Sequence, residues 1–142
     1  MEKLRAFLKR KDIVFSAKRY FIDAMGAMAQ GLFCTLLVGT ILNTIGTQFG
    51  IACLKNAIVT IGSGEGAVKY TIGGLCSAMV GPGIAVAIGF ALHCPSLVLF
   101  SLIPVGFAAN AMGGAGGPLA VLFVTILAAE LGKAVSKETK ID

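Results

Sequence analysis

Charge is almost missing from two long stretches of this chain. Residues 24–54 contain no Asp, Glu, Lys or Arg, and between Tyr70 and Ala129 the only side chain that titrates near neutral pH is His93. Charged residues make up 13% of the sequence, hydrophobic residues 56%, and the mean hydropathy is +0.88. Soluble domains contain about 25% charged residues. The deficit therefore excludes an ordinary soluble domain and predicts an integral membrane protein.

The residue types of common catalytic and metal sites are also scarce. One histidine, without a serine or cysteine and an orienting carboxylate nearby, does not make a nucleophilic triad. The glycine-rich segment 62–66 lacks the Gly-Lys-Ser/Thr ending of a phosphate loop. We expect no metal and no cofactor, because no cysteine forms a CxxC pair or lies at metal spacing from the histidine. The cysteines, which we expect to pack as small core residues, are Cys34, Cys53, Cys76 and Cys94.

Positive charge is concentrated at the N-terminus, where seven of the twelve basic residues fall within the first nineteen positions. This distribution suits an anionic membrane surface better than nucleic acid. Leu4, Phe7 and Leu8 share one helical face, and basic residues occupy the others. We therefore expect residues 1–22 to form an amphipathic helix on the cytoplasmic leaflet, with the N-terminus inside the cell. A solvated, partly ordered leader is the alternative.

The apolar remainder predicts an all-α membrane protein with four to five transmembrane or half-spanning helices after the interfacial helix. A span takes about 20 residues, and glycine or proline interrupts several segments. We expect a transmembrane domain at 23–136 and a polar tail at 137–142. The tail and Lys133 repeat the positive-inside signal and favour an even number of spans. The expected segments are Ala24–Ile45, Phe49–Ile61, Tyr70–Leu92 broken near Pro82, a half-helix at Ser96–Ala109, and Leu119–Val135.

Interrupted apolar segments are informative about function. Prolines 82, 95 and 104 and the cluster Gly113–Pro118 should cut the second half of the chain into pieces of about a dozen residues. Membrane proteins tolerate discontinuous helices only where the freed backbone is buried in protein or lines a cavity. The pattern therefore favours a transporter or channel core. In Phe49–Ile61, Lys55 implies an interfacial or re-entrant element, or a span with Lys55 facing a wet cavity.

Polar residues in these surroundings are the candidate binding residues. Glu65, between glycines, is able to accept hydrogen bonds from solute hydroxyls, or lies in an exposed turn. His93, at a helix break, either binds solute or only makes a hydrogen bond at the helix end. Asn110 either binds solute or caps a helix. We expect Glu65 and His93 to line one water-accessible cavity.

Three further features of the apolar segments allow more limited expectations. Gln30 and Asn43 are the polar exceptions in the first span. Glu130 and Lys133, three apart on one helix face, are more typical of an interfacial ion pair than of a proton relay. Glycines promote close helix contact in lipid, so we expect a homo-oligomer that associates through Gly26, Gly31, Gly39 and Gly113–Gly117.

Several segments resemble the second type of phosphotransferase-system enzyme IIC. They are FLKRKDIVFS at 7–16, KRYFIDAMGAMA at 18–29, Gly-Pro-Gly at 81–83, and KETKID at 137–142. The resemblance runs across the whole chain. Family members are generally more than twice this length, and the chain resembles their N-terminal portion or a shortened relative. A site shared between two halves would then be incomplete.

The resemblance implies a multi-pass protein of the bacterial inner membrane. An enzyme IIC binds a sugar at mid-membrane, and a separate cytoplasmic enzyme IIB transfers phosphate from its cysteine or histidine to that sugar. In better-known enzyme IIC groups, a glutamate in a re-entrant loop and a histidine contact the sugar, and Glu65 and His93 are residues of these types. As an enzyme, the chain would be the permease component, with the phosphoryl donor on another subunit.

Two other function classes remain open on the sequence. The same broken helices suit a membrane-embedded binding or regulatory protein for an apolar ligand such as a fatty acid. A structural or assembly partner with no ligand is the third class. In all three the chain contacts membrane lipids, and in none do we expect it to bind nucleic acid.

Overall fold

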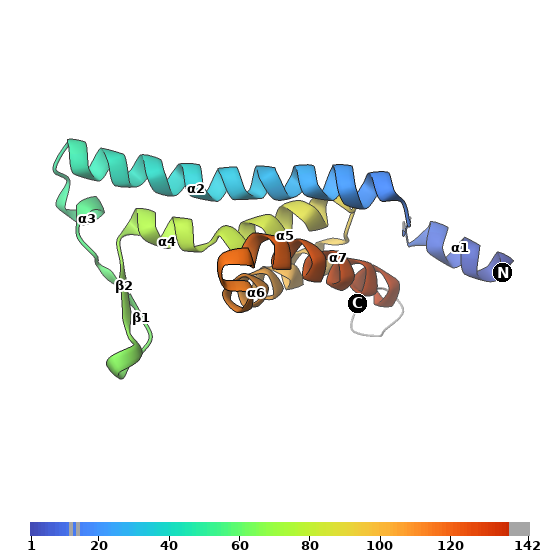
Figure 1. Ribbon diagram of the computed structural model, residues 1–142. Helices are drawn as coiled ribbons and strands as arrows, with labels where there is room; N and C mark the ends of the chain where they lie inside the picture. The colour runs from blue at the N-terminus through green and yellow to red at the C-terminus, as the bar shows by residue number, and fades with distance from the viewer. Residues whose placement is uncertain (12, 14, 137–142) are drawn as a thin grey trace. The chain divides into compact units, whose positions relative to one another are not determined.

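The computed structural model describes residues 1–11, 13 and 15–136 (Figure 1). The chain divides into two compact units. One contains Met1–Leu32 and Gly81–Asp142, and the other contains Phe33–Val80. The polar tail expected at 137–142 lies outside the described residues.

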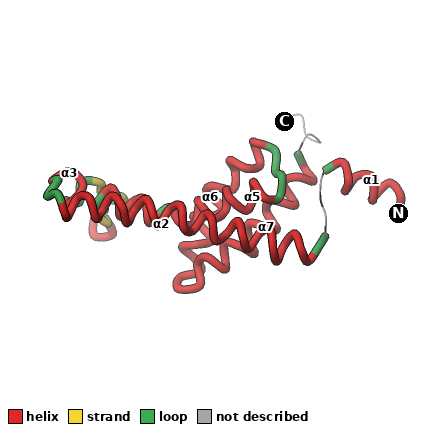
Figure 2. Tube along the Cα trace, turned by 90° about the horizontal axis from the view of Figure 1, so that it is seen from above, coloured by secondary structure: helices red, strands yellow, loops and turns green. Residues whose placement is uncertain are grey.

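Helices make up most of the described chain, as the red tube in Figure 2 shows. The prediction of a helical membrane protein is confirmed in this general form. A turn of π-helix, Lys18–Asp23, leads directly into the longest helix, α2. The helices are α1 (Glu2–Arg10), α2 (Ala24–Gln48), α3 (Ala52–Lys55), α4 (Ile72–Ala78), α5 (Val80–Ala91), α6 (Ser96–Gly113) and α7 (Gly117–Val135).

Two helical stretches among the described residues are long and apolar enough to cross a membrane, namely Lys18–Gln48 and Ser96–Val135. The interrupted pair α4 and α5 would be a third span if it crosses as one unit. The second stretch folds back at Gly114–Gly116. The contacts of Gly132 with Val98 and of Gly113 with Ala120 show that its two arms lie side by side. It therefore contains an antiparallel hairpin. Its arms of 18 and 19 residues rise about 27 and 28.5 Å, close to the bilayer core of about 30 Å.

The core of the first unit lies between α5, α6 and α7. Ile84, Ile88 and Val121 are fully buried there. Glycine allows these helices to approach closely, since a Cβ on Gly106 would lie 2.5 Å from the Gly81 carbonyl oxygen and from Ala85 Cβ. Close contact between small residues is the usual way in which helices associate in lipid. Backbone proximity therefore holds α5 against α6.

Several glycines expected at an interface between copies are used inside the chain. A Cβ on Gly31 would lie 2.5 Å from the Gly83 carbonyl oxygen, and one on Gly39 would lie 2.6 Å from the Gly73 carbonyl oxygen. Gly26 has nothing within 4 Å of a Cβ position. Of these three glycines of α2, only Gly26 stays open to another molecule.

The prolines interrupt the helices less than the sequence predicted. Helix α6 continues through Pro104 to Gly113, so the expected half-helix ending at Ala109 is wrong. Pro82 lies in the first turn of α5, where its missing N–H would have no acceptor within the helix. The interruption near Pro82 falls at Met79 instead. Proline thus marks the beginning of α5 and is accommodated inside α6.

The second unit contains a short β-hairpin that the sequence analysis did not predict. Strand β1 (Val59–Ile61) pairs antiparallel with β2 (Val68–Tyr70), with Thr60 opposite Lys69. Valine, threonine and isoleucine favour strands, and Gly62 and Gly64 take the positive φ angles of 98° and 72° that the turn requires. The expected element Phe49–Ile61 is therefore not a span, since it contains only the short helix α3 and a strand.

The broken span expected at Tyr70–Leu92 corresponds to the bent pair α4 and α5. Helix α4 begins at Ile72, where the Thr71 hydroxyl caps the first turn by accepting a hydrogen bond from Gly74 N at 2.9 Å. One expectation about the cysteines is corrected. All four cysteines are free, and Cys34 and Cys53 are exposed, so the expected core packing is wrong for these two.

The Gly81 contact gives a test of the helix packing. Gly81→Ala would place a Cβ 2.6 Å from Asn110 Cβ, and the overpacking should destabilise the protein by about 1 to 3 kcal/mol. Thermal unfolding in detergent, followed by circular dichroism, measures the loss. Gly26→Ala is the matched control and should be neutral or slightly stabilising. Equal melting temperatures for the two variants would contradict the close approach of α5 and α6.

Candidate functional site

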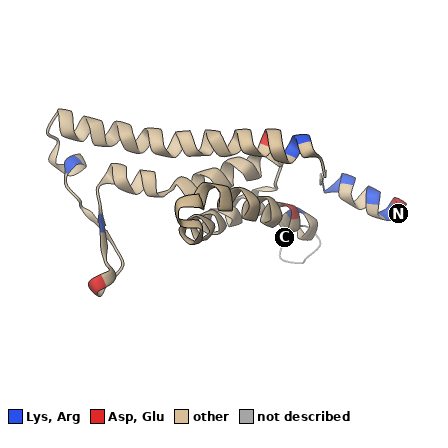
Figure 3. Cartoon of the chain, in the orientation of Figure 1, with Lys and Arg blue, Asp and Glu red and all other residues tan. Residues whose placement is uncertain are grey.

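The four predicted binding residues fall into the two units. Glu65 lies in the 3-10 turn Gly64–Gly66 at the tip of the β-hairpin, and Lys55 is the last residue of α3, both exposed in the second unit. His93 and Asn110 belong to the first unit. The shared cavity of Glu65 and His93 stays a prediction. Figure 3 shows that the long helices carry few charged residues, as the sequence requires.

His93 ends helix α5 in an unusual conformation. Its φ angle is 58°, and it is the only non-glycine residue with a positive φ in the described part of the chain. The His93 N–H donates to the Phe90 carbonyl at 3.1 Å, and the Cys94 N–H donates to the Gly89 carbonyl at 3.0 Å. These two bonds form a Schellman motif, in which the left-handed position is usually glycine. His93 therefore occupies a glycine position, and its side chain is exposed.

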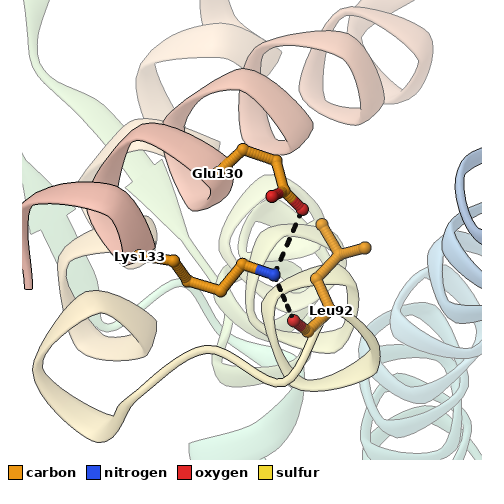
Figure 4. A network of polar contacts seen from close by, with 3 residues as sticks. All are labelled: Leu92, Glu130 and Lys133. Carbon is orange, nitrogen blue, oxygen red and sulfur yellow. Dashed lines mark hydrogen bonds and ion pairs between the residues drawn. The ribbon is translucent and has the colours of Figure 1, made fainter. Parts of the chain in front are cut away.

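The residue before this turn is held by a buried lysine (Figure 4). Lys133 Nζ, from α7, donates a hydrogen bond to the Leu92 carbonyl oxygen at 2.8 Å and lies 3.2 Å from Glu130 Oε1. The Lys133 side chain is 1% exposed and that of Glu130 is 12% exposed. A cation at a helix C-terminus also interacts favourably with the helix dipole. Lys133 thus joins the end of α5 to α7.

Other polar groups lie around this pair. The Tyr20 hydroxyl and both Glu130 carboxylate oxygens are buried and have no hydrogen-bond partner among the described residues, so Glu130 relies on its ion pair with Lys133. Lys11 Nζ donates to the Ser136 carbonyl oxygen. Burial raises the pKa of the Cys94 thiol to about 11, against the opposing effect of the Lys133 charge. The thiol is therefore protonated at neutral pH.

The sequence predicted the pairing of Glu130 with Lys133 but missed its burial and its bond to Leu92. The available signal was the single basic residue inside an apolar helical segment. A lysine there must find a partner in protein, and the carbonyls left free where α5 ends at His93 offered one.

Asn110 lies where three helices meet. It is half-buried in α6, and a Cβ on Gly117 of α7 would lie 2.8 Å from its carbonyl oxygen. Gly81 of α5 lies against its Cβ on the other side. Because α6 continues to Gly113, the expected helix-ending cap is wrong. Asn110 is enclosed by glycines of both neighbouring helices.

A polar contact in the second unit was also missed. Thr71 Oγ1 donates to Asn43 Oδ1 at 3.1 Å, which links α2 to the N-terminus of α4. The signal was present as an asparagine within an uncharged span.

No group of three or more His, Cys, Asp or Glu that could hold a metal ion is found among the described residues.

Removing the Lys133 ammonium should strongly destabilise the first unit. Lys133→Met leaves the Glu130 carboxylate buried without its cation and the Leu92 carbonyl without its donor. Breaking a buried pair in this way costs about 3 to 5 kcal/mol. The double variant Lys133→Met with Glu130→Leu should recover part of the loss in thermal unfolding. No recovery would mean that the carbonyl bond alone sets the stability.

Two substitutions at His93 separate the structural role of this residue from a role in binding, because its backbone conformation favours glycine. His93→Gly should leave the melting temperature unchanged or slightly higher, because glycine adopts positive φ freely. His93→Val should lower the stability by about 1 to 2 kcal/mol, the cost of the left-handed conformation in a side chain less tolerant of it than histidine. A loss of stability with His93→Gly as large as that with His93→Val would show that the imidazole side chain itself stabilises the fold.

Comparison with known proteins identifies a family match for most of the chain. No curated protein and no solved structure matches the chain. The family model described as "Phosphotransferase system, EIIC" matches residues 22–142, which include helices α2 to α7. The chain therefore belongs to the phosphotransferase-system EIIC family, the membrane sugar-transport components of these systems.

Proposed function

We propose that this chain is the membrane-embedded permease part of a sugar phosphotransferase system and binds a small sugar between its interrupted helices. The family match over residues 22–142 carries the proposal. The interruptions at Met79 and at the turn after α5 support it, because irregular backbone inside a membrane protein is found where it lines a cavity or is covered by protein.

The proposed sugar contacts are Glu65, His93, Asn110 and Lys55. A carboxylate accepts hydrogen bonds from sugar hydroxyls, while an amide and an imidazole both donate and accept. Lys55 adds three donors. His93 is the best supported of the four, because a histidine in a conformation that favours glycine is a strained residue of the kind found at functional sites.

The proposed topology follows from the basic N-terminal segment. Helix α1 and the residues up to 22 lie on the cytoplasmic leaflet, with the basic side chains near anionic headgroups. Residues 23–136 then cross the bacterial inner membrane several times, with the N-terminus in the cytoplasm.

Two partners complete the proposal. A cytoplasmic subunit carries the phosphoryl group and transfers it to the bound sugar, so this chain supplies the permease step. A second copy of the chain associates through lipid-facing surfaces that contain Gly26 and the turn at 113–117, where small residues permit close contact.

One observation favours the alternative of an apolar ligand such as a fatty acid. A groove of about 350 Å³ in the first unit has an almost entirely apolar lining. Apolar pockets of this size suit small apolar molecules. The groove is lined by Tyr20, Phe21, Met25, Leu119, Leu122, Phe123 and Ile126.

A ligand screen decides between the two. A ligand at a hundred times its dissociation constant stabilises its protein by about 2.7 kcal/mol, so a binding sugar should raise the melting temperature of the purified protein in detergent. Glu65→Gln and His93→Gly should each weaken sugar binding by about 1 to 3 kcal/mol without loss of membrane insertion. Stabilisation by fatty acids and by no sugar would favour the alternative.

A further inference from the structure

The second half of α2 carries a strip of polar side chains on an uncharged helix. Its members follow at i, i+3, i+4 and i+7, so they share one side of the helix. This helix belongs to one of the two stretches that are long and apolar enough to span a membrane. The strip consists of Thr40, Asn43, Thr44 and Thr47.

Asn43 is held in a fixed orientation by α4. Its Oδ1 accepts the Thr71 hydroxyl at 3.1 Å, and Thr71 Oγ1 in turn accepts from Gly74 N at 2.9 Å. Gly73 leaves the space that this contact needs, since a Cβ there would lie 2.5 Å from Asn43 Oδ1. With its oxygen engaged, the side chain presents its NH₂ group, which makes no hydrogen bond within the described part of the chain.

The threonines of the strip are held as well. Their hydroxyls donate to backbone carbonyls of the same helix, from Thr40 to Leu36 at 2.7 Å, from Thr44 to Thr40 at 2.8 Å and from Thr47 to Asn43 at 3.0 Å. Each hydroxyl proton is therefore used, and the oxygen lone pairs remain as acceptors. Fixed N–H donors thus lie beside fixed oxygen acceptors.

A strip of this kind is unsuited to lipid, because hydrocarbon offers no partner to two amide N–H donors. The hydroxyls of a sugar both donate and accept hydrogen bonds, and so match a row that offers both. We propose that Asn43, with Thr40, Thr44 and Thr47, forms a hydrogen-bonding subsite for a polyhydroxylated solute, and that Thr71 acts as its positioning residue. The class of solute rests on the proposed sugar transport.

Cysteine accessibility tests whether the strip faces water. In a full-length variant whose four native cysteines are replaced by alanine, single cysteines are placed at Thr40, Asn43 and Thr47. Val38 and Ile41, which are 48% and 47% exposed on other sides of the same helix, are the matched controls. A hydrophilic thiosulfonate should react at the three strip positions roughly tenfold faster or more, because the reactive thiolate forms in water.

Two outcomes of the labelling would overturn the proposal. Equal reaction at all five positions would mean that the whole helix lies in water. No reaction at any strip position would mean that lipid or a second copy of the chain covers the strip. Protection of Asn43→Cys or Thr47→Cys by a sugar is the expected further result.

Asn43→Asp tests the solute contact itself. It retains an acceptor for Thr71 and removes both N–H donors, so sugar affinity measured by thermal shift should fall roughly tenfold. Val38→Ala is the control and should bind normally. Thr71→Val should lower the affinity for the sugar. A cysteine placed at Thr40 in the Thr71→Val protein should still react with the thiosulfonate, because the strip itself stays exposed to water. Unchanged affinity in Asn43→Asp would overturn the subsite, whereas an open strip in a protein that binds no sugar would overturn the proposed function and the solute class together.

Discussion

The hydrogen bond from Lys133 to the Leu92 carbonyl is the contact on which the first unit depends most. Helix α5 ends at Ala91, and the last carbonyls of a helix have no hydrogen-bond donor within the helix itself. A Schellman turn satisfies two of them, and the lysine supplies a donor to a third. Since the lysine comes from α7, the same bond closes α5 against the hairpin of α6 and α7. Glu130 balances the buried charge.

Glycine and proline serve different purposes along the chain. Gly31, Gly81 and Gly106 permit backbone contact between helices, while Gly62 and Gly64 allow the turn of the β-hairpin. Pro82 begins a helix and Pro104 lies within one. Because the same residue types also break helices, their positions in a sequence show where something unusual happens without showing which of these it is.

The sequence was sufficient for the class of protein but not for the places where helices end, since α6 continues past Ala109 to Gly113. Charge depletion over residues 24–54 and 70–129 predicted the apolar helices, and the family resemblance noted across the chain agrees with the family match over residues 22–142. It was insufficient for the hairpin of β1 and β2, since three-residue strands carry little periodicity. The Lys133 contact with Leu92 also lay beyond it, because that bond joins residues far apart in the chain.

The candidate site was predicted in part for the same reason. Asn110 and His93 were identified as polar exceptions in apolar segments, yet the glycines around Asn110 come from two other helices. The positive φ of His93 depends on how the chain leaves α5. The orientation of the Asn43 side chain is set by its hydrogen bond with Thr71, which lies 28 residues away in the sequence. Local composition identified which residues were unusual, and tertiary contacts determined what surrounds them.

The hairpin of α6 and α7 has a consequence for the biogenesis of the protein. Its two arms are neighbours in the sequence and are joined by a turn of only three residues, Gly114–Gly116. Contacts between segments adjacent in sequence form early and quickly, because little loop entropy is lost. During synthesis the pair is therefore able to enter the bilayer as a preformed unit, with the backbone of each arm already satisfied. Lys133, near the end of the second arm, is synthesised after α5 and α6, so its bond to Leu92 forms only once most of the second arm has been made.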